Sequence, residues 1–152
     1  MKHKPIKRAE EMQGVSRDHH HALLLAWKIN KGIDKNIDVQ RITDYLHWFR
    51  DEHLLPHFEI EENLMFPVLG STNEKVKRAL QDHYFLSQQS LTANNYQELA
   101  VFAEKLKEHI RFEERDLFQD IQAVATSGQL KQIAKHHKEG DFCERTPDEF
   151  WL

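Results

Sequence analysis

The sequence predicts an all-α protein whose long helices form an up-down-up-down four-helix bundle, with a short C-terminal extra helix and a tail. Only five Gly and four Pro occur in 152 residues, and few β-branched residues alternate as they would in strands. Apolar residues recur three and four positions apart over long stretches joined by short loops. At this length, with 39% hydrophobic residues, we expect a single domain over residues 1–152, with its core at about 16–126.

The limits of the first two helices can be placed on the sequence. The first is expected from Ser16, whose hydroxyl can cap it, to about Lys31-Gly32, because Gly suits the end of a helix. The second is expected from about Asp38 to Leu69-Gly70. Pro56 lies inside it and should kink it, because proline has no N–H to donate.

The remaining helices follow the same periodicity. The third is expected from about Asn73 to Leu91 and the fourth from about Asn95 to Ala125. A short fifth helix should follow Gly128, and three apolar residues of the tail should hold it against the bundle. These are Phe142, Phe150 and Trp151.

Composition excludes several classes of function. The formal net charge is −4 with His neutral, and the basic residues are scattered, which argues against nucleic-acid binding. Cys143 is the one cysteine, so no internal disulfide can form and a reducing compartment is expected. The N-terminus lacks the apolar run of a signal peptide, and no stretch could span a membrane. We therefore expect a cytoplasmic protein with no membrane partner.

One pattern occurs twice, in the second and the fourth predicted helix. The two windows are residues 57–66 and 109–118. In each, a His is followed after three residues by Glu-Glu, and after two more residues by an apolar pair that ends in Phe. On an α-helix, residues four apart lie about 6 Å apart on one face. His57 with Glu61, and His109 with Glu113, should therefore each point an imidazole and a carboxylate in the same direction, as half of a metal site.

The repeat extends to the other two helices, because Asp18-His19 in the first is echoed by Asp82-His83 in the third. The chain thus consists of two helix pairs, each supplying one His from its first helix and a His and a Glu from its second. A bundle can bring such residues to one height. The predicted metal ligands are His19, His57, Glu61, His83, His109 and Glu113.

The first-helix ligand must be chosen from His19, His20 and His21. At 100° per residue, His19 falls within about 40° of the centre of the apolar face. His20 lies on the flank, and His21 faces away. We therefore predict His19, with His20 as the alternative if packing rotates the helix.

Four imidazoles and two carboxylates suit a pair of metal ions, because a carboxylate can bridge while each imidazole ends on one ion. Non-haem iron fits this donor set best; zinc or manganese would also fit, but magnesium and calcium would not. Glu61 and Glu113 on inward faces also need a compensating cation, because unpaired buried charge is costly.

Other polar residues receive ordinary interpretations. Glu62 and Glu114 should face outward or support the ligands, and His53 should support them or pack in the core rather than act as a seventh ligand. His47, His136 and His137 are interpreted as ordinary helix residues.

These residues resemble the hemerythrin-like, or HHE cation-binding, domain family. The resemblance rests on the His57 window with its Glu-Glu and Met65-Phe66-Pro67 ending, its copy at His109, and the Asp-His sites at His19 and His83. It covers the chain from about Ser16 to Phe118. It implies a four-helix bundle holding an oxo- or hydroxo-bridged pair of iron ions.

The resemblance also implies a role for each ligand. The four His would be terminal ligands, and Glu61 and Glu113 would be bridging carboxylates. Oxygen-carrying hemerythrins have a second third-helix His where this chain has Ser87. The set of four His and two Glu is more similar to the branch that includes bacterial iron-sulphur cluster repair proteins and the iron-sensing ubiquitin ligase domain.

Three functions remain open at this point. The first is a di-iron protein that senses, carries or buffers O2, NO or iron, with O2 or NO as its small partner and its protein partner unknown. The second is an enzyme that uses the same centre for peroxide or nitric oxide turnover or for iron donation. The third is a metal-free helical interaction module. The sequence favours binding over catalysis, because no separate acid, base or substrate pocket is discernible.

Overall fold

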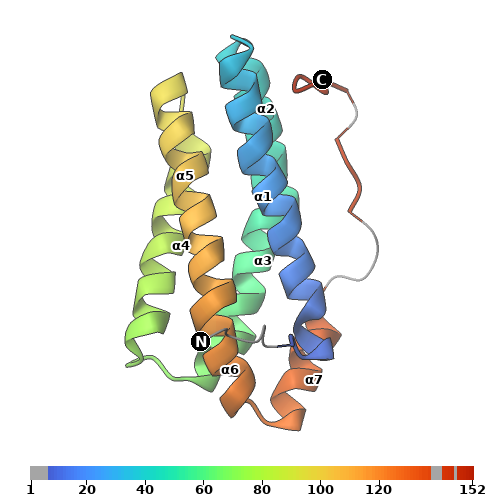
Figure 1. Ribbon diagram of the computed structural model, residues 1–152, viewed down its shortest axis with the longest axis vertical. Helices are drawn as coiled ribbons and strands as arrows, with labels where there is room; N and C mark the ends of the chain where they lie inside the picture. The colour runs from blue at the N-terminus through green and yellow to red at the C-terminus, as the bar shows by residue number, and fades with distance from the viewer. Residues whose placement is uncertain (1–6, 138–141, 146) are drawn as a thin grey trace, which may run out of the picture.

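The computed structural model describes residues 7–137, 142–145 and 147–152, and within these ranges helix is the only regular secondary structure. Long helical rods lie side by side along the longest axis of the molecule (Figure 1). The all-helical prediction is confirmed.

The first rod is η1 (Glu10–Met12) and α1 (Gln13–Asp34). The second is α2 (Val39–Phe49), η2 (Arg50–Leu54), α3 (Leu55–Ile60), η3 (Glu61–Met65) and η4 (Phe66–Val68). The third is α4 (Glu74–Thr92), and the fourth is α5 (Tyr96–Phe112), η5 (Glu113–Leu117) and α6 (Phe118–Val124); α7 (Ser127–His136) follows.

Side-chain caps start the second, third and fourth rods where the sequence predicts. Asp38, Asn73 and Asn95 each accept a hydrogen bond from a backbone N–H in the first turn of their helix. Such caps satisfy donors that have no partner within the helix. The fifth helix begins one residue before Gly128, where Thr126 and Gln129 form a capping box.

The predicted limits of the first helix are wrong at both ends. Helix starts at Glu10, because Met12 and Val15 are fully buried and anchor an extra turn. Ser16 lies inside the helix and its hydroxyl donates to Glu114. The helix also continues past Gly32. This glycine does not end the helix; its missing side chain leaves room for Phe150 and Ile42 to pack against α1. The left-handed position that ends the helix is Asn36, with φ of 55°.

The second rod runs through Pro56 by widening its hydrogen-bond ladder. In the π-helical turn η2, the N–H of Leu55 donates to the carbonyl of Arg50, five residues back. A π turn of this kind absorbs a position where the regular ladder cannot form. The proline therefore changes the helix without ending it.

Two further π-helical turns lie at equivalent positions of the duplicated windows. In η3 the N–H of Phe66 donates to the carbonyl of Glu61, and in η5 that of Phe118 donates to the carbonyl of Glu113. Each widened turn thus begins at a predicted carboxylate ligand. Single π turns in helices are frequent at functional sites.

The apolar core consists of two clusters. One gathers α1, α2, α4 and α5 around residues such as Leu46 and Phe102, and the other gathers around Met65 and Phe118. In the second rod, His57 and Glu61 lie between Leu54 of the first cluster and Met65 of the second. A polar layer therefore interrupts the core at the height of the predicted ligands.

The C-terminal tail lies against α1 and α2, as its apolar residues predict. Phe150 and Trp151 are buried, and Phe150 fills the space beside Gly32, where an added Cβ would approach its ring to 2.8 Å. Lys28, also buried, donates to Tyr45 (2.9 Å) and Glu144 (2.5 Å). Buried lysine is rare unless paired, so this network fixes the path of the tail.

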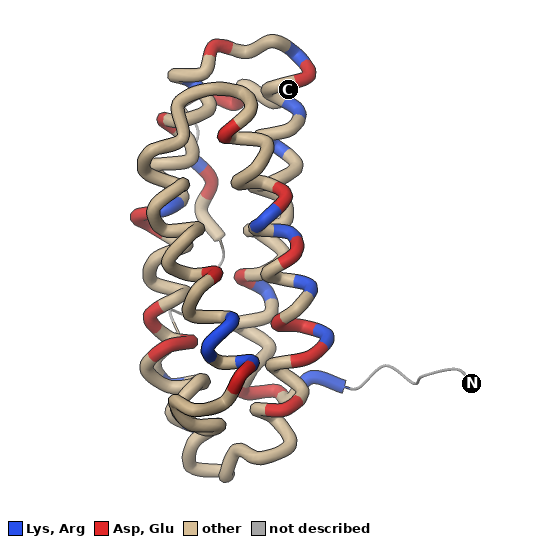
Figure 2. Tube along the Cα trace, turned by 90° about the vertical axis from the view of Figure 1, so that its left-hand side faces the viewer, with Lys and Arg blue, Asp and Glu red and all other residues tan. Residues whose placement is uncertain are grey.

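Charged residues of both signs lie along the described rods. Figure 2 shows Lys and Arg interspersed with Asp and Glu along the rods. In the described part of the chain, no helix combines the length and the apolar character needed to cross a membrane.

Candidate metal centre

Six buried side chains converge in the polar layer. Their ligand atoms form two groups of four, and within each group all atoms lie within 4.8 Å of one another. The first group is His19, His57, Glu61 and Glu113; the second is Glu61, His83, His109 and Glu113. Both groups contain the same two carboxylates, so each carboxylate lies between two pairs of imidazoles.

The separations between these atoms suit a shared cation. The Oε1 atom of Glu61 lies 3.2 Å from Nε2 of His57 and 3.1 Å from Nε2 of His83. The Oε1 atom of Glu113 lies 3.0 Å from Nε2 of both His19 and His109. Two ligands bound at right angles, each about 2.1 Å from one metal ion, lie about 3 Å apart.

Several of these buried atoms have no hydrogen-bond partner among the described residues. They include Nε2 of His57, His83 and His109, both carboxylate oxygens of Glu61, and Oε2 of Glu113. A buried polar atom without a partner costs about 1–3 kcal/mol, and a charged one costs more. The donor set therefore fits a metal ion, which would satisfy all of these atoms together.

A further carboxylate lies behind each imidazole. Nδ1 of His57 donates to Asp18 (3.0 Å), and Nδ1 of His109 donates to Asp82 (3.0 Å). This hydrogen bond fixes the tautomer in which Nε2 carries a free lone pair for a metal.

Only one of the other two imidazoles repeats this hydrogen bond. Nδ1 of His83 donates to Glu62 (2.9 Å), whereas Nδ1 of His19 lies 3.4 Å from Glu114 without a hydrogen bond among the described residues. Asp18 and Asp82 each come directly before a predicted ligand in the sequence and contact a ligand on another rod. Glu62 and Glu114 each come directly after a predicted ligand. The centre thus repeats in space the duplication seen in the sequence.

Comparison with protein-family models gives a match to the hemerythrin HHE cation binding domain over residues 12–121. The match spans well over half of the chain and contains all six converging residues. The chain belongs to the hemerythrin HHE family. Searches of curated proteins and of solved structures give no significant match.

Membership of the HHE family agrees with the resemblance seen in the sequence and indicates cation binding. The structure places the six predicted residues together, on four different rods. It brings His19 into the centre, with 4% of its surface exposed, and leaves His20 on the surface. His53 lies outside both groups and contacts the rings of Trp48, Phe49 and Phe142.

One sequence interpretation is wrong. His137 is not an ordinary helix residue, because its Nε2 donates to Asp18 (2.9 Å), the carboxylate that supports His57. In the sequence, Asp18 is recognisable only as part of the repeated Asp-His pair. The duplicated Asp-His pairs were the available signal for the role of Asp18 and Asp82. No pattern in the sequence pointed to His137, because its partner is more than a hundred residues away.

Aromatic rings pack against two imidazoles of the HHE centre. Phe58 stacks on His83 with 3.8 Å between ring centroids, and Phe118 stacks on His19 at 5.0 Å. Glu61 and Glu113 are fully buried. Electrostatic interactions of these carboxylates therefore act at low dielectric constant.

The buried carboxylates dominate the protonation of the metal-free centre. Burial alone would lower the pKa of His57, but the charge of Glu61 and the hydrogen bond to Asp18 outweigh it and raise that pKa to about 9. For His109, the charge of Glu113 and the bond to Asp82 likewise outweigh burial and raise the pKa to about 9. The centre thus attracts positive charge strongly.

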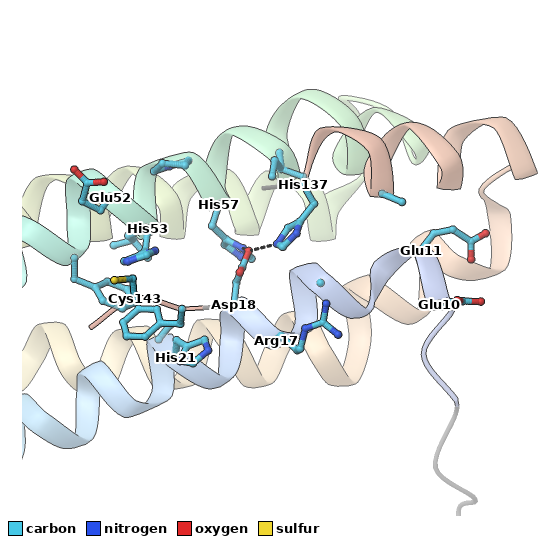
Figure 3. Close-up of a pocket in the computed structure, with 18 residues that line it drawn as sticks. Glu10, Glu11, Arg17, Asp18, His21, Glu52, His53, His57, His137 and Cys143 are labelled. Atoms are coloured by element: carbon cyan, nitrogen blue, oxygen red, sulfur yellow. Dashed lines mark hydrogen bonds and ion pairs between the residues drawn. The ribbon is translucent and has the colours of Figure 1, made fainter. Parts of the chain in front are cut away.

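A cavity of about 580 Å³ lies beside the centre, on the outer side of His57. Figure 3 shows Asp18 between His57 and His137 in this cavity, with His53 and Cys143 farther along its wall. The cavity contacts the supporting carboxylate Asp18 as well as one face of a converging imidazole. It brings solvent close to one half of the centre.

Proposed function

We propose that this protein binds two iron ions in its HHE centre and uses them to sense, carry or buffer O2, NO or iron. One observation carries the proposal: two groups of four buried ligand atoms share both of their carboxylates. His19, His57, His83 and His109 would be terminal ligands, and Glu61 and Glu113 would bridge.

The choice of a metal pair follows from the donor set. Each group offers two imidazoles and two shared carboxylates, which leaves coordination positions open on both ions. Mixed imidazole and carboxylate shells with open positions favour iron over zinc or manganese. Two ions would also offset the two central and four supporting carboxylates, whose described cationic partners include Lys105 on Asp82 and Arg8 beside Glu114.

The chain's own residues supply orientation and enclosure. The supporting carboxylates hold His57, His83 and His109 in one tautomer, and the rings of Phe58 and Phe118 stack on His83 and His19. Bound iron would supply open positions for a diatomic ligand and the electrons for binding it. The burial of every ligand favours a small ligand over an organic substrate.

We also infer the up-down-up-down order of the rods that a di-iron bundle requires. Short connections, residues 35–38, 69–73 and 93–95, join successive rods. Connections of this length favour antiparallel neighbours. A cytoplasmic location suits the single cysteine and the oxygen chemistry proposed.

The alternative function is enzymatic, with the same centre turning over peroxide or nitric oxide or donating iron in iron-sulphur repair. Binding is favoured because, among the described residues, the carboxylates behind the imidazoles are already engaged with them and are not free to act as an independent acid or base. Sustained turnover by the iron-loaded protein would favour the enzyme instead.

The test is metal content per chain after purification without chelator, together with ultraviolet-visible spectra before and after anaerobic reduction and re-exposure to air. We expect about two irons per chain and a charge-transfer band that responds to oxygen or nitric oxide. Zinc or manganese at the same stoichiometry would replace iron in the proposal. No bound metal, and no uptake of Fe²⁺ on reconstitution, would overturn it in favour of a metal-free interaction module.

Matched variants separate the centre from its surroundings. His57→Ala should abolish the two-iron stoichiometry, because it removes a terminal ligand. His53→Ala, one turn away on the same rod, should retain it. Equal loss in the two variants would contradict the assignment of His57.

A further inference from the structure

The two supporting aspartates of the HHE centre have different second partners. Asp82 accepts from Lys105 (2.9 Å) as well as from His109. Asp18 accepts from His137 (2.9 Å) as well as from His57 (3.0 Å), both at the same oxygen, Oδ2. The two halves of the centre therefore differ at these aspartates, and at Asp18 the difference comes from a side chain that follows α7.

His137 lies outside the part of the chain that matches the family model, which ends at residue 121. It follows the last turn of α7, whose Ile133 is fully buried in the core cluster with Met12 and Met65. The capping box at Thr126 fixes the other end of the helix. A helix outside the family match thus reaches the polar layer through a single imidazole.

The backbone of α1 is shaped for this imidazole. A Cβ added to Gly14 would lie 2.7 Å from Nδ1 of His137 and 2.9 Å from its Cε1. Real Cβ atoms do not approach so closely, so glycine at this position lets the ring reach Asp18, one helical turn farther along. At Gly128 in α7, an added Cβ meets nothing closer than 3.9 Å.

The contact also closes one side of the cavity. Asp18, His57 and His137 line the same 580 Å³ space, and the dashed line in Figure 3 joins His137 to Asp18. Without His137, water in the cavity could compete with His57 for the carboxylate. His57 would then lose its fixed tautomer and orientation.

We propose that His137 is a positioning residue of the metal centre, which couples the docking of α7 to metal binding by the group that contains His57. The proposal rests on the proposed metal-binding function and adds α7 to the centre. His137 touches no metal; it holds Asp18, and Asp18 holds His57. Because coupling between two equilibria is reciprocal, metal must stabilise docked α7 as much as docked α7 strengthens metal binding.

The first test is anaerobic Fe²⁺ titration of full-length variants. His137→Ala should weaken iron binding about 10- to 100-fold, the effect typical of residues that support a metal ligand. His137→Gln should restore much of the affinity, because its amide can donate to Asp18. The control is His136→Ala, since the exposed His136 contacts only the carbonyl of its own helix among the described interactions.

The second test uses Gly14→Ala, with Gly128→Ala as its control. Gly14→Ala should weaken iron binding as His137→Ala does, and the double variant should be no weaker than either single one, because both changes break one contact. Additive losses, or no loss in His137→Ala, would overturn the proposal. Gly128→Ala should retain the wild-type affinity.

Hydrogen exchange of α7 amides, with and without Fe²⁺, separates positioning from general stabilisation. Iron should slow exchange in α7 of the wild type and of His136→Ala, but not in His137→Ala. A lower stability of metal-free His137→Ala with unchanged iron affinity would mean a structural role and overturn the proposal. A wild-type chain that binds neither Fe²⁺ nor Zn²⁺ would overturn the proposed function as well.

Discussion

At the scale of single residues, the supporting carboxylates decide how the imidazoles face the centre. A histidine has two nitrogens, and a carboxylate on Nδ1 leaves Nε2 free to bind a cation. Three such pairs surround Glu61 and Glu113 here, and Glu114 lies 3.4 Å from Nδ1 of His19. The two Glu residues of each window therefore have different positions. The first lies in the centre, and the second lies behind an imidazole of another rod.

This division predicts a graded response to substitution in one helix. Glu61→Gln should abolish two-metal binding, because it removes a shared carboxylate. Glu62→Gln should weaken binding about 10- to 100-fold, because it weakens the hydrogen bond to His83. Isothermal titration with Fe²⁺ under anaerobic conditions measures both, and exposed Glu59→Gln is the control. Similar affinities for Glu59→Gln and Glu62→Gln would contradict the support assigned to Glu62.

At the scale of elements, π-helical turns and the tail adapt a regular bundle to its site. Both π turns in the duplicated windows begin at a central carboxylate. A widened turn adds one residue to the helix circumference and so changes which side chains face inward beyond it. Elsewhere on α1, Lys28 forms an ion pair with Glu144, which holds the tail against the bundle.

The contacts of Glu144 in the tail should make the stability of the protein depend on pH, independently of the metal centre. Burial by itself would raise the pKa of Glu144, but hydrogen bonds from Lys28 and Tyr45 outweigh it and hold that pKa below its usual 4.5. A carboxyl with a lowered folded-state pKa contributes stability above its unfolded pKa and loses it as pH falls through the folded value. The unfolding free energy of the wild type should therefore exceed that of Glu144→Gln at pH 7, and the difference should shrink below about pH 4.5. Urea titrations across this range measure it; a constant difference would contradict the role of the charge.

At the scale of the whole molecule, a polar layer divides the apolar core. Fully buried Glu61 and Glu113 lie between two apolar clusters, where unpaired charge would destabilise the fold. Protonated imidazoles can supply the opposite charge in the metal-free chain, and metal ions can supply it in the loaded one. The stability of the bundle is therefore linked to the contents of its centre.

Metal removal should consequently destabilise the whole chain. A ligand at a thousand times its Kd stabilises a folded protein by about 4 kcal/mol, so a chelator should lower the melting temperature of the iron-loaded wild type clearly. In Glu113→Gln the chelator should have little effect, because the variant lacks a shared ligand. Differential scanning calorimetry measures both. An unchanged melting temperature of the wild type would indicate that the fold does not depend on metal.

The sequence by itself determined the helical class, the capped starts at Asp38, Asn73 and Asn95, and the set of residues that converge. These features are local or periodic: caps need neighbouring residues, and an imidazole and a carboxylate four apart share a face whatever surrounds them. The duplication then predicted which helices belong together. The choice of His19 over His20 also followed from the angle of the apolar face.

Only the tertiary structure decided the features that depend on packing between distant segments. The π turns at Glu61 and Glu113, the burial of Gly32 beneath Phe150, and the contact of His137 with Asp18 leave no periodic trace in the sequence. Residues 18 and 137 become neighbours only because α7 folds back against η1 and η3. The sequence thus predicted which side chains converge, while packing decided what holds them in place.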